Sequence, residues 1–464
     1  MKLSTVMEAM GDAHQTRCVR TLVWGVVLTI FLIWPASLFA DGSSESDRQI
    51  WKVGGRRWTV QEEKKYAKWV EANITEDFFI RNRIPVDCAD VVYAARWIYA
   101  RISHLPAAAT TVDKRLTGHW STDWGHLRTN EPWNRDRRFR AALLFMLAKT
   151  WTRTLPADVY PVKVDADAVQ AGTAFYTTES HSGIVRSIVL DGSAAHPIQT
   201  AEATLPCRVQ KLRFKDFNSP DPEPQSYSGL VQFRWPTERN GRWEYLPVRE
   251  HPYYSEEQYF PAFHEGYADY IDAVAGRIDP KIYDPRERVH RILEVLSRRL
   301  KERIPIVLDG QSKCPRGHCP EGSVLWEIYS TPGRDESLIV AISHLEDILK
   351  QSRIDRESVL EEADRIPLQI SPDRRITVKH SLENARWFSS DPEASVAARW
   401  GLDKCDAIAM HIRSAEDAIQ FIIETYGHKD PEFAERSLWV RRHDLDELVE
   451  QRRKSHCELS PVHY

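Results

Sequence analysis

The period of the hydrophobic pattern changes part-way along the chain, and this change constrains the fold more than any other feature. In the first part, apolar residues recur every three to four positions, which predicts helices over 59–81, 87–105 and 139–151. The pattern then alternates or becomes rich in β-forming residues, which predicts strands at 173–176, 182–190 and 207–214. Helices followed by strands predict an α+β fold in which N-terminal helices pack on an antiparallel sheet.

A chain of 464 residues is long enough for about two to three domains. We expect the helix-then-strand domain at 60–217, followed by a proline-rich linker or wrapping segment at 218–252. Residues 253–464 read as an accessory region of mixed, mainly helical structure. Within it the pattern predicts a helix over 255–303, a strand at Ile304–Leu308, a helix around 338–349, short strands at 368–379 and charged helices from Ala407 onward.

The first forty residues are typical of a targeting segment. Arg17 and Arg20 precede a long apolar run that ends at Ala40, before a polar stretch. Cleavage after Ala40 would give a periplasmic or secreted protein. Retention of residues 22–40 would anchor the chain in the inner membrane, because the run approaches the length that spans a bilayer. In both cases we expect the bulk of the chain outside the cytoplasm, with no other contact to a membrane.

Six of the seven cysteines lie beyond this segment, in a compartment that permits disulfides. Cys314 and Cys319 flank a Pro-Arg-Gly-His turn, and we predict a disulfide between them. The alternatives are two thiols or a zinc site that also uses His318. Zinc requires a fourth ligand, and no second pair at the spacing of a zinc finger follows. We therefore expect no metal, and no motif in the sequence predicts a cofactor.

Cys88 is the strongest candidate for chemistry. It follows Pro85-Val86-Asp87 at the start of a predicted helix, where the helix dipole favours a thiolate. A nucleophilic thiolate needs a base, and His181 opens a strand after a strand and a turn. A third polar group must orient that imidazole; we expect His196, with Asp191 as the competitor. The alternative is that Cys88 is a buried core residue, since it belongs to the apolar stripe of its helix.

An aromatic insertion separates this helix from the next. Trp120, Trp124 and Trp133 could stack on sugars or hold a peptide, or form a small core that fixes a long loop. The net charge of −4 gives the chain no electrostatic attraction to nucleic acid, so we expect no such partner.

Three short motifs resemble those of the NlpC-type papain-fold cell-wall peptidases. Asp87-Cys88-Ala89-Asp90-Val91-Val92 is similar to their Asp-Cys-Ser-Gly-Leu-Val signature. The segments 171–176 and 181–185 resemble their Gly-Asp-Leu-Val-Phe-Phe and His-Val-Gly-Ile-Tyr strands. The resemblance covers about residues 80–215 and implies a papain-like thiol hydrolase that cleaves an amide bond in a cell-wall peptide or glycopeptide. In it, Cys88 attacks, His181 transfers the proton and His196 matches the third residue.

The sequence also departs from that family. Ala89-Asp90 replaces the Ser-Gly pair, and a carboxylate beside the thiol would raise its pKa. The long spacing between Cys88 and His181 requires an insertion at 107–150. The Cys88 helix also resembles that of bacterial transglutaminase-like proteins, in which an Asp follows the His; this would promote Asp191 and imply acyl transfer. A third hypothesis is a non-catalytic envelope module that binds through its tryptophans.

Overall fold

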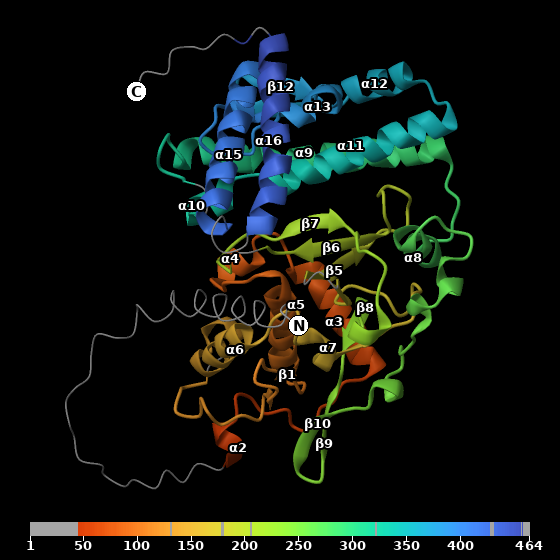
Figure 1. The fold of residues 1–464 in the computed structure, drawn as a ribbon, viewed down its shortest axis with the longest axis vertical. Coiled ribbons are helices and arrows are strands. Elements are labelled where there is room, and N and C mark those ends of the chain that lie inside the picture. The colour runs from red at the N-terminus through yellow and green to blue at the C-terminus, as the bar shows by residue number, and fades with distance from the viewer. Residues whose placement is uncertain are drawn as a thin grey trace, which may run out of the picture. The chain divides into compact units, whose positions relative to one another are not determined.

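The computed structural model describes residues 45–464, except 130–131, 178–180, 205–206, 321–322, 427–430, 456 and 458–464. The chain divides into two compact units (Figure 1). The first contains the described residues up to 190 together with 196–282, and the second contains 191–195 together with the residues from 283 onward. The predicted targeting segment, 1–40, lies outside the described residues. Within the described ranges, no helix combines the length and the apolar character needed to cross a bilayer.

The first unit has the predicted α+β order, with most of its helices before its strands. Its helices are α2 (Glu45–Arg48), α3 (Val60–Asn73), α4 (Phe78–Asn82), α5 (Cys88–Ser103), α6 (Arg137–Lys149), α7 (Leu155–Asp158) and α8 (Tyr270–Ile278). Two small hairpins pair β1 (Ala108–Thr110) with β2 (Leu116–Gly118), and β9 (Pro236–Arg239) with β10 (Arg242–Tyr245).

A six-stranded antiparallel sheet forms the centre of this unit, in the order β3-β8-β4-β5-β6-β7. The strands are β3 (Val159–Pro161), β4 (Ala174–Tyr176), β5 (Ser182–Ile188), β6 (Ile198–Glu202), β7 (Arg213–Asp216) and β8 (Gly229–Phe233). The predicted strands at 173–176 and 182–190 correspond to β4 and β5. Of the strand predicted at 207–214, only the last residues belong to a strand, β7.

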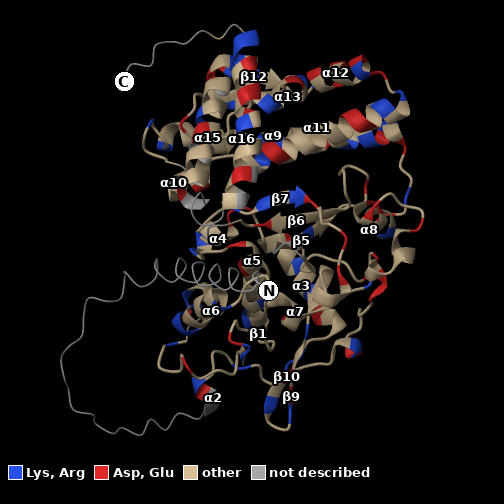
Figure 2. Ribbon diagram, viewed as in Figure 1, with Lys and Arg blue, Asp and Glu red and all other residues tan. Residues whose placement is uncertain are grey.

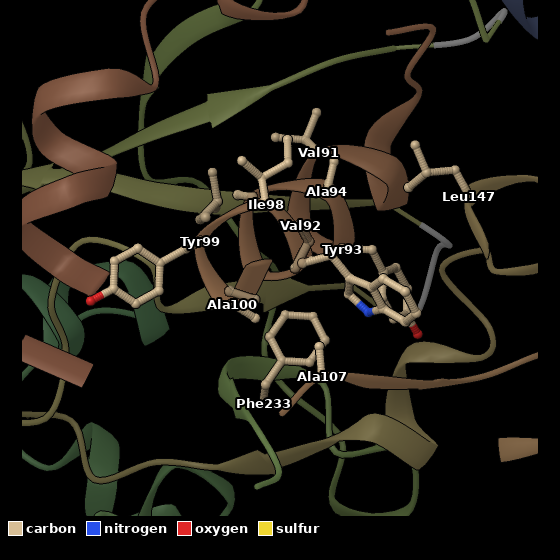
Figure 3. Packing of buried hydrophobic residues seen from close by; sticks show 14 of the residues in the cluster. Val91, Val92, Tyr93, Ala94, Ile98, Tyr99, Ala100, Ala107, Leu147 and Phe233 are labelled. Carbon is tan, nitrogen blue, oxygen red and sulfur yellow. The ribbon is translucent and has the colours of Figure 1, made fainter. Parts of the chain in front are cut away.

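Both faces of the sheet are covered, which explains why β4 and β8 are apolar at consecutive positions. Ala174 and Ile184 pack into the cluster around α5, whereas Phe175 and Val185 pack into the cluster that contains α8. α5 packs against β5, and its residues 89–101 are buried. Figure 3 shows this helix with Leu147 of α6 and Phe233 of β8 packed around it. A helix buried on almost all sides gives its first residue, Cys88, a fixed position.

The segment 218–252 is not a linker. Its residues 229–233 form β8, an inner strand of the sheet that lies between β3 and β4. Leu230 and Val231 are fully buried, one in each of the two clusters. The prolines that suggested a linker flank this strand, and proline cannot donate a hydrogen bond to a sheet. The boundary of the first unit therefore lies near residue 282 and not at 217.

The second unit is mainly helical, as expected. Its helices are α9 (Pro285–Lys313), α10 (Val324–Tyr329), α11 (Pro332–Ser352), α12 (Arg356–Asp364), α13 (Val378–Asn384), α14 (Val396–Arg399), α15 (Lys404–Tyr426) and α16 (Pro431–Lys454). One hairpin, β11 (Pro367–Ser371) with β12 (Arg374–Thr377), accounts for the short strands predicted at 368–379.

The strand predicted at Ile304–Leu308 is wrong. These residues continue α9, although Pro305 lies inside the helix. The β-branched residues favour a strand by themselves. Val307, however, is buried in the same cluster as Leu296 and Leu300 of this helix. Packing of this cluster overrides the local preference.

Candidate active site

A capping box fixes the start of α5. The Asp87 side chain accepts a hydrogen bond from the Asp90 backbone N–H, and the Asp90 side chain accepts one from the Asp87 backbone N–H. Cys88 is therefore the first residue of a 16-residue helix, at the end where the helix dipole is positive. Its side chain is partly exposed and is a thiol, not half of a disulfide. This is a position that favours a reactive thiolate.

His181 meets Cys88 across the boundary between the helix and the sheet. It directly precedes β5, and Thr177 holds its backbone: the Thr177 N–H donates to the His181 carbonyl oxygen at 2.8 Å. The imidazole forms a hydrogen bond with the Cys88 thiol and a second one with Glu202. These two bonds, that of Cys88 first, raise the pKa of His181 to about 9, although burial opposes the shift. A charged imidazole next to the thiol stabilises its thiolate form.

The third member of the site is Glu202, which the sequence did not suggest. It is the last residue of β6, and its Oε2 lies 2.9 Å from His181 Nε2. Because Nε2 faces the carboxylate, Nδ1 is the nitrogen available to the thiol. Burial would raise the pKa of Glu202, but hydrogen bonds from His181 and Thr200 outweigh it and lower the pKa. Thr200 donates to Oε1 at 2.7 Å, and Lys215 Nζ lies 4.0 Å from Oε2.

Gly183 provides the space through which Glu202 reaches the imidazole. β5 and β6 pair with Ile184 opposite Ala201, which places Gly183 opposite Glu202. A Cβ atom at Gly183 would lie 2.8 Å from Glu202 Cγ and 2.6 Å from Phe175 Cε1. Both distances are shorter than carbon atoms tolerate. The glycine two residues after His181 therefore has a physical role in this strand.

Asp90, two residues after Cys88, is a buried carboxyl group. Burial, followed by the charge of Asp87, raises the pKa of Asp90 well above its ordinary value. A raised pKa means that the charged form of this carboxyl group is disfavoured. The departure from the Ser-Gly pair is therefore compatible with a reactive Cys88.

The structure does not place His196 in the site. Its Nδ1 accepts a hydrogen bond from the Ile198 backbone N–H, and its Nε2 lies 3.3 Å from the Ile271 carbonyl oxygen. Burial lowers its pKa to about 4. Asp191 is engaged in a turn, where its Oδ1 accepts hydrogen bonds from Ser193.

Both residues lie beyond the far end of β5 from His181. The strand has seven residues, which corresponds to more than about 20 Å. A residue that faces the start of β5 must come from the end of the next strand, which is where Glu202 lies. Ile198, Thr200 and Glu202 occupy every second position of β6, so their side chains face the same side of the sheet. This spacing was the sequence signal that could have pointed to Glu202.

The insertion tryptophans form ring contacts with other side chains, as in a small core. Trp120 stacks on Trp243 with centroids 5.2 Å apart, and Trp124 packs on Phe145. Trp133 packs between Phe78 and Phe139. The neighbour of Trp120, His119, donates its backbone N–H to the Ala107 carbonyl oxygen beyond the C-terminal end of α5, about 24 Å along the helix from Cys88. The structure does not support a binding platform of these rings at the thiol.

Cys314 and Cys319 form the expected disulfide, with Cα atoms 5.4 Å apart. This bond consumes the two thiolates that a zinc site would need, and His318 lies on the surface beside the Arg316 carbonyl oxygen. A second disulfide, Cys405–Cys457, was not predicted. The possible ligand atoms of Asp87, Asp90 and Cys207 lie close to one another, but Cys207 is disulfide-bonded. Asp87 and Asp90 already form the helix cap, and we assign no metal to them.

Charges of both signs are interleaved over the helices. Figure 2 shows acidic and basic segments alternating along α9, α11 and α12, while β7 is basic.

No protein-family model, curated protein or solved structure matches this chain.

Proposed function

We propose that this chain is an exported thiol hydrolase that cleaves an amide bond, with Cys88 as nucleophile, His181 as proton carrier and Glu202 as the residue that orients the imidazole. One observation carries the proposal. The thiol at the start of α5 and the carboxylate at the end of β6 bond the same imidazole. A nucleophile, its base and a group that orients the base are the three parts that acyl-transfer chemistry requires.

The reaction begins from the thiolate–imidazolium pair. The Cys88 sulfur attacks the amide carbonyl carbon, and the N–H groups of the first turn of α5 are suited to stabilise the resulting oxyanion. His181 gives its proton to the leaving amine as the carbon–nitrogen bond breaks, which leaves a thioester on Cys88. His181 then takes a proton from water, and the hydroxide attacks the thioester. This step releases the carboxylic acid and restores the pair.

One argument supports a substrate in the cell wall, and another supports a location outside the cytoplasm. The motifs at Cys88 and His181 resemble those of cell-wall peptidases, with cell-wall peptide or glycopeptide as substrate. The disulfides Cys314–Cys319 and Cys405–Cys457 are typical of an oxidising compartment. The apolar segment before residue 40 is then the export signal or the membrane anchor.

The test is digestion of purified cell-wall peptide by the full chain, followed by measurement of new amino groups and mass spectrometry of the products. We expect cleavage by the native protein and none by Cys88→Ala. His181→Ala should cost about 100- to 10,000-fold in rate, which is the usual contribution of a positioned base. His196→Gln is the matched control and should retain the native rate. Equal product from Cys88→Ala would contradict the proposal.

One observation favours a second candidate, transglutaminase-like acyl transfer. In that family the third residue of the site is an Asp that comes after the His in the chain. Here the third member is also acidic, Glu202, and not a second histidine. The two reactions share the thioester and differ in the group that attacks it. Added primary amines should therefore be incorporated into the product by an acyl transferase, whereas a hydrolase releases the acid.

A further inference from the structure

A hydroxyl group also reaches the Cys88 sulfur. Thr152 lies in the loop between α6 and α7, and its Oγ1 is 3.4 Å from Cys88 Sγ. The residue is 5% exposed, so water has little access to this hydroxyl. Within the described part of the chain, the Cys88 sulfur is the one hydrogen-bond partner of the Thr152 hydroxyl. A buried hydroxyl whose partner is the nucleophilic atom is a candidate for a chemical role.

The loop that carries Thr152 is fixed to the same helix that carries Cys88. Thr154 Oγ1 accepts a hydrogen bond from the Trp151 backbone N–H at 3.2 Å and donates to the Trp151 carbonyl oxygen at 3.0 Å. Thr154 Oγ1 also lies 3.3 Å from the hydroxyl oxygen of Tyr93 on α5, and Tyr93 donates its own proton to the buried Asp158 at 2.7 Å. These bonds hold the loop at a defined position beside the first turns of α5, so Thr152 does not have to be ordered when the thiolate forms.

We propose that Thr152 stabilises the reactive form of the site by donating its hydroxyl proton to the Cys88 thiolate. The inference rests on the proposed function, because it assigns a role at the same sulfur. A hydroxyl rotates freely about its C–O bond and can therefore point its proton at the sulfur. Hydrogen bonds to a charged acceptor are about twice as strong as those to a neutral one. Thr152 thus favours the thiolate over both the neutral thiol and the thioester.

The test is the pH dependence of Cys88 alkylation by iodoacetamide, measured on the full chain by peptide mapping. Thr152→Val keeps the shape of the side chain and removes the hydroxyl. It should raise the midpoint of the profile by about one pH unit and slow alkylation about tenfold below that midpoint. The alkylation rates of the native protein and Thr152→Val should converge at high pH, because Cys88 is then a thiolate in both. Thr152→Ser restores the hydroxyl and should return the midpoint to within about 0.3 unit of the native value.

Thr150→Val is the matched control. Thr150 is a buried threonine of the same connection, but its hydroxyl donates to the Met146 carbonyl oxygen. This variant reports the effect of a lost hydroxyl on local packing and should leave the midpoint unchanged. An unchanged midpoint in Thr152→Val, with a clear effect of His181→Ala, would overturn the role of Thr152 and leave the proposed function intact. An unchanged profile in His181→Ala would overturn the proposed function itself.

Discussion

At the scale of single residues, the site depends on an imidazole that is held between a thiol and a carboxylate. The pKa of His181 is raised to about 9, above the ordinary value of 6.5. A group whose pKa is higher in the folded state stabilises that state fully below its unfolded pKa, and this contribution is lost as the pH rises through the folded value. The His181 contribution should therefore be complete below about pH 6.5 and disappear toward pH 9.

Replacement of Glu202 by Gln should lower the pKa of His181 by about one unit or more, because the imidazolium loses a negative partner. The expected cost in catalytic rate is about 10- to 100-fold, the equivalent of a hydrogen bond to a charged group. NMR titration of the His181 ring, assigned with His181→Gln, measures the first effect. His196→Gln, the control, should leave this titration unchanged. A His181 that titrates near 6.5 in the native protein would contradict the assignment of Glu202.

The sequence predicted the thiol and the imidazole at this scale because each is marked by local features. Cys88 follows a capping aspartate, and His181 follows a strand and a turn. The position of Glu202 depends on the register between β5 and β6, which local sequence does not specify. His196 is nearer to His181 along the chain but lies at the other end of the hairpin.

At the scale of elements, β5 must pass close to the Glu202 side chain. Replacing Gly183 by Ala places a methyl group against Glu202 and Phe175. We expect a loss of about 1–3 kcal/mol in the free energy of unfolding, as is typical of overpacking. We also expect a lower His181 pKa, because Glu202 must move.

Urea unfolding and the same NMR titration test this prediction. Ser182→Ala is the control in the same strand, since it removes a buried hydroxyl that bonds no other group among the described residues. It should leave the His181 titration as in the native protein. If Gly183→Ala keeps both the native stability and the native titration, Gly183 is not needed to make room for Glu202.

Several elements of the first unit follow from their own patterns, and two of the errors, one in each unit, have a common cause. α3, α5, α6, β4 and β5 have an apolar period that matches their structure. β8 was missed because prolines surround a five-residue strand whose pairing partners, β3 and β4, are distant in sequence. Ile304–Leu308 was assigned as a strand because its β-branched residues are also compatible with a buried helix. In both cases tertiary contacts decide the structure.

At the scale of the whole molecule, the candidate site belongs to the first unit alone. Cys88, Thr152, His181 and Glu202 all lie within it. A fragment of residues 45–282 should therefore fold cooperatively and keep a reactive Cys88. A fragment that ends at residue 217 lacks β8, which leaves β3 and β4 without the strand that pairs with both of them.

Denaturant unfolding of the two fragments tests this division. The shorter fragment should show no cooperative transition, because the fully buried Leu230 and Val231 are absent from both core clusters. The longer fragment should show one transition. A cooperative transition in the shorter fragment would mean that β8 is dispensable and that the boundary at 217 is correct.

The most direct test of the account is the alkylation rate of Cys88 in the native, reduced protein at pH 6–7. If Cys88 and His181 form a thiolate–imidazolium pair, Cys88 should be the thiol that alkylates fastest, because the thiolate is the reactive form of the side chain. His181→Ala should slow the reaction about tenfold or more, since it removes the cation that stabilises the thiolate. If Cys88 instead reacts only after the protein is unfolded, it is a core residue and the chain is not a thiol hydrolase.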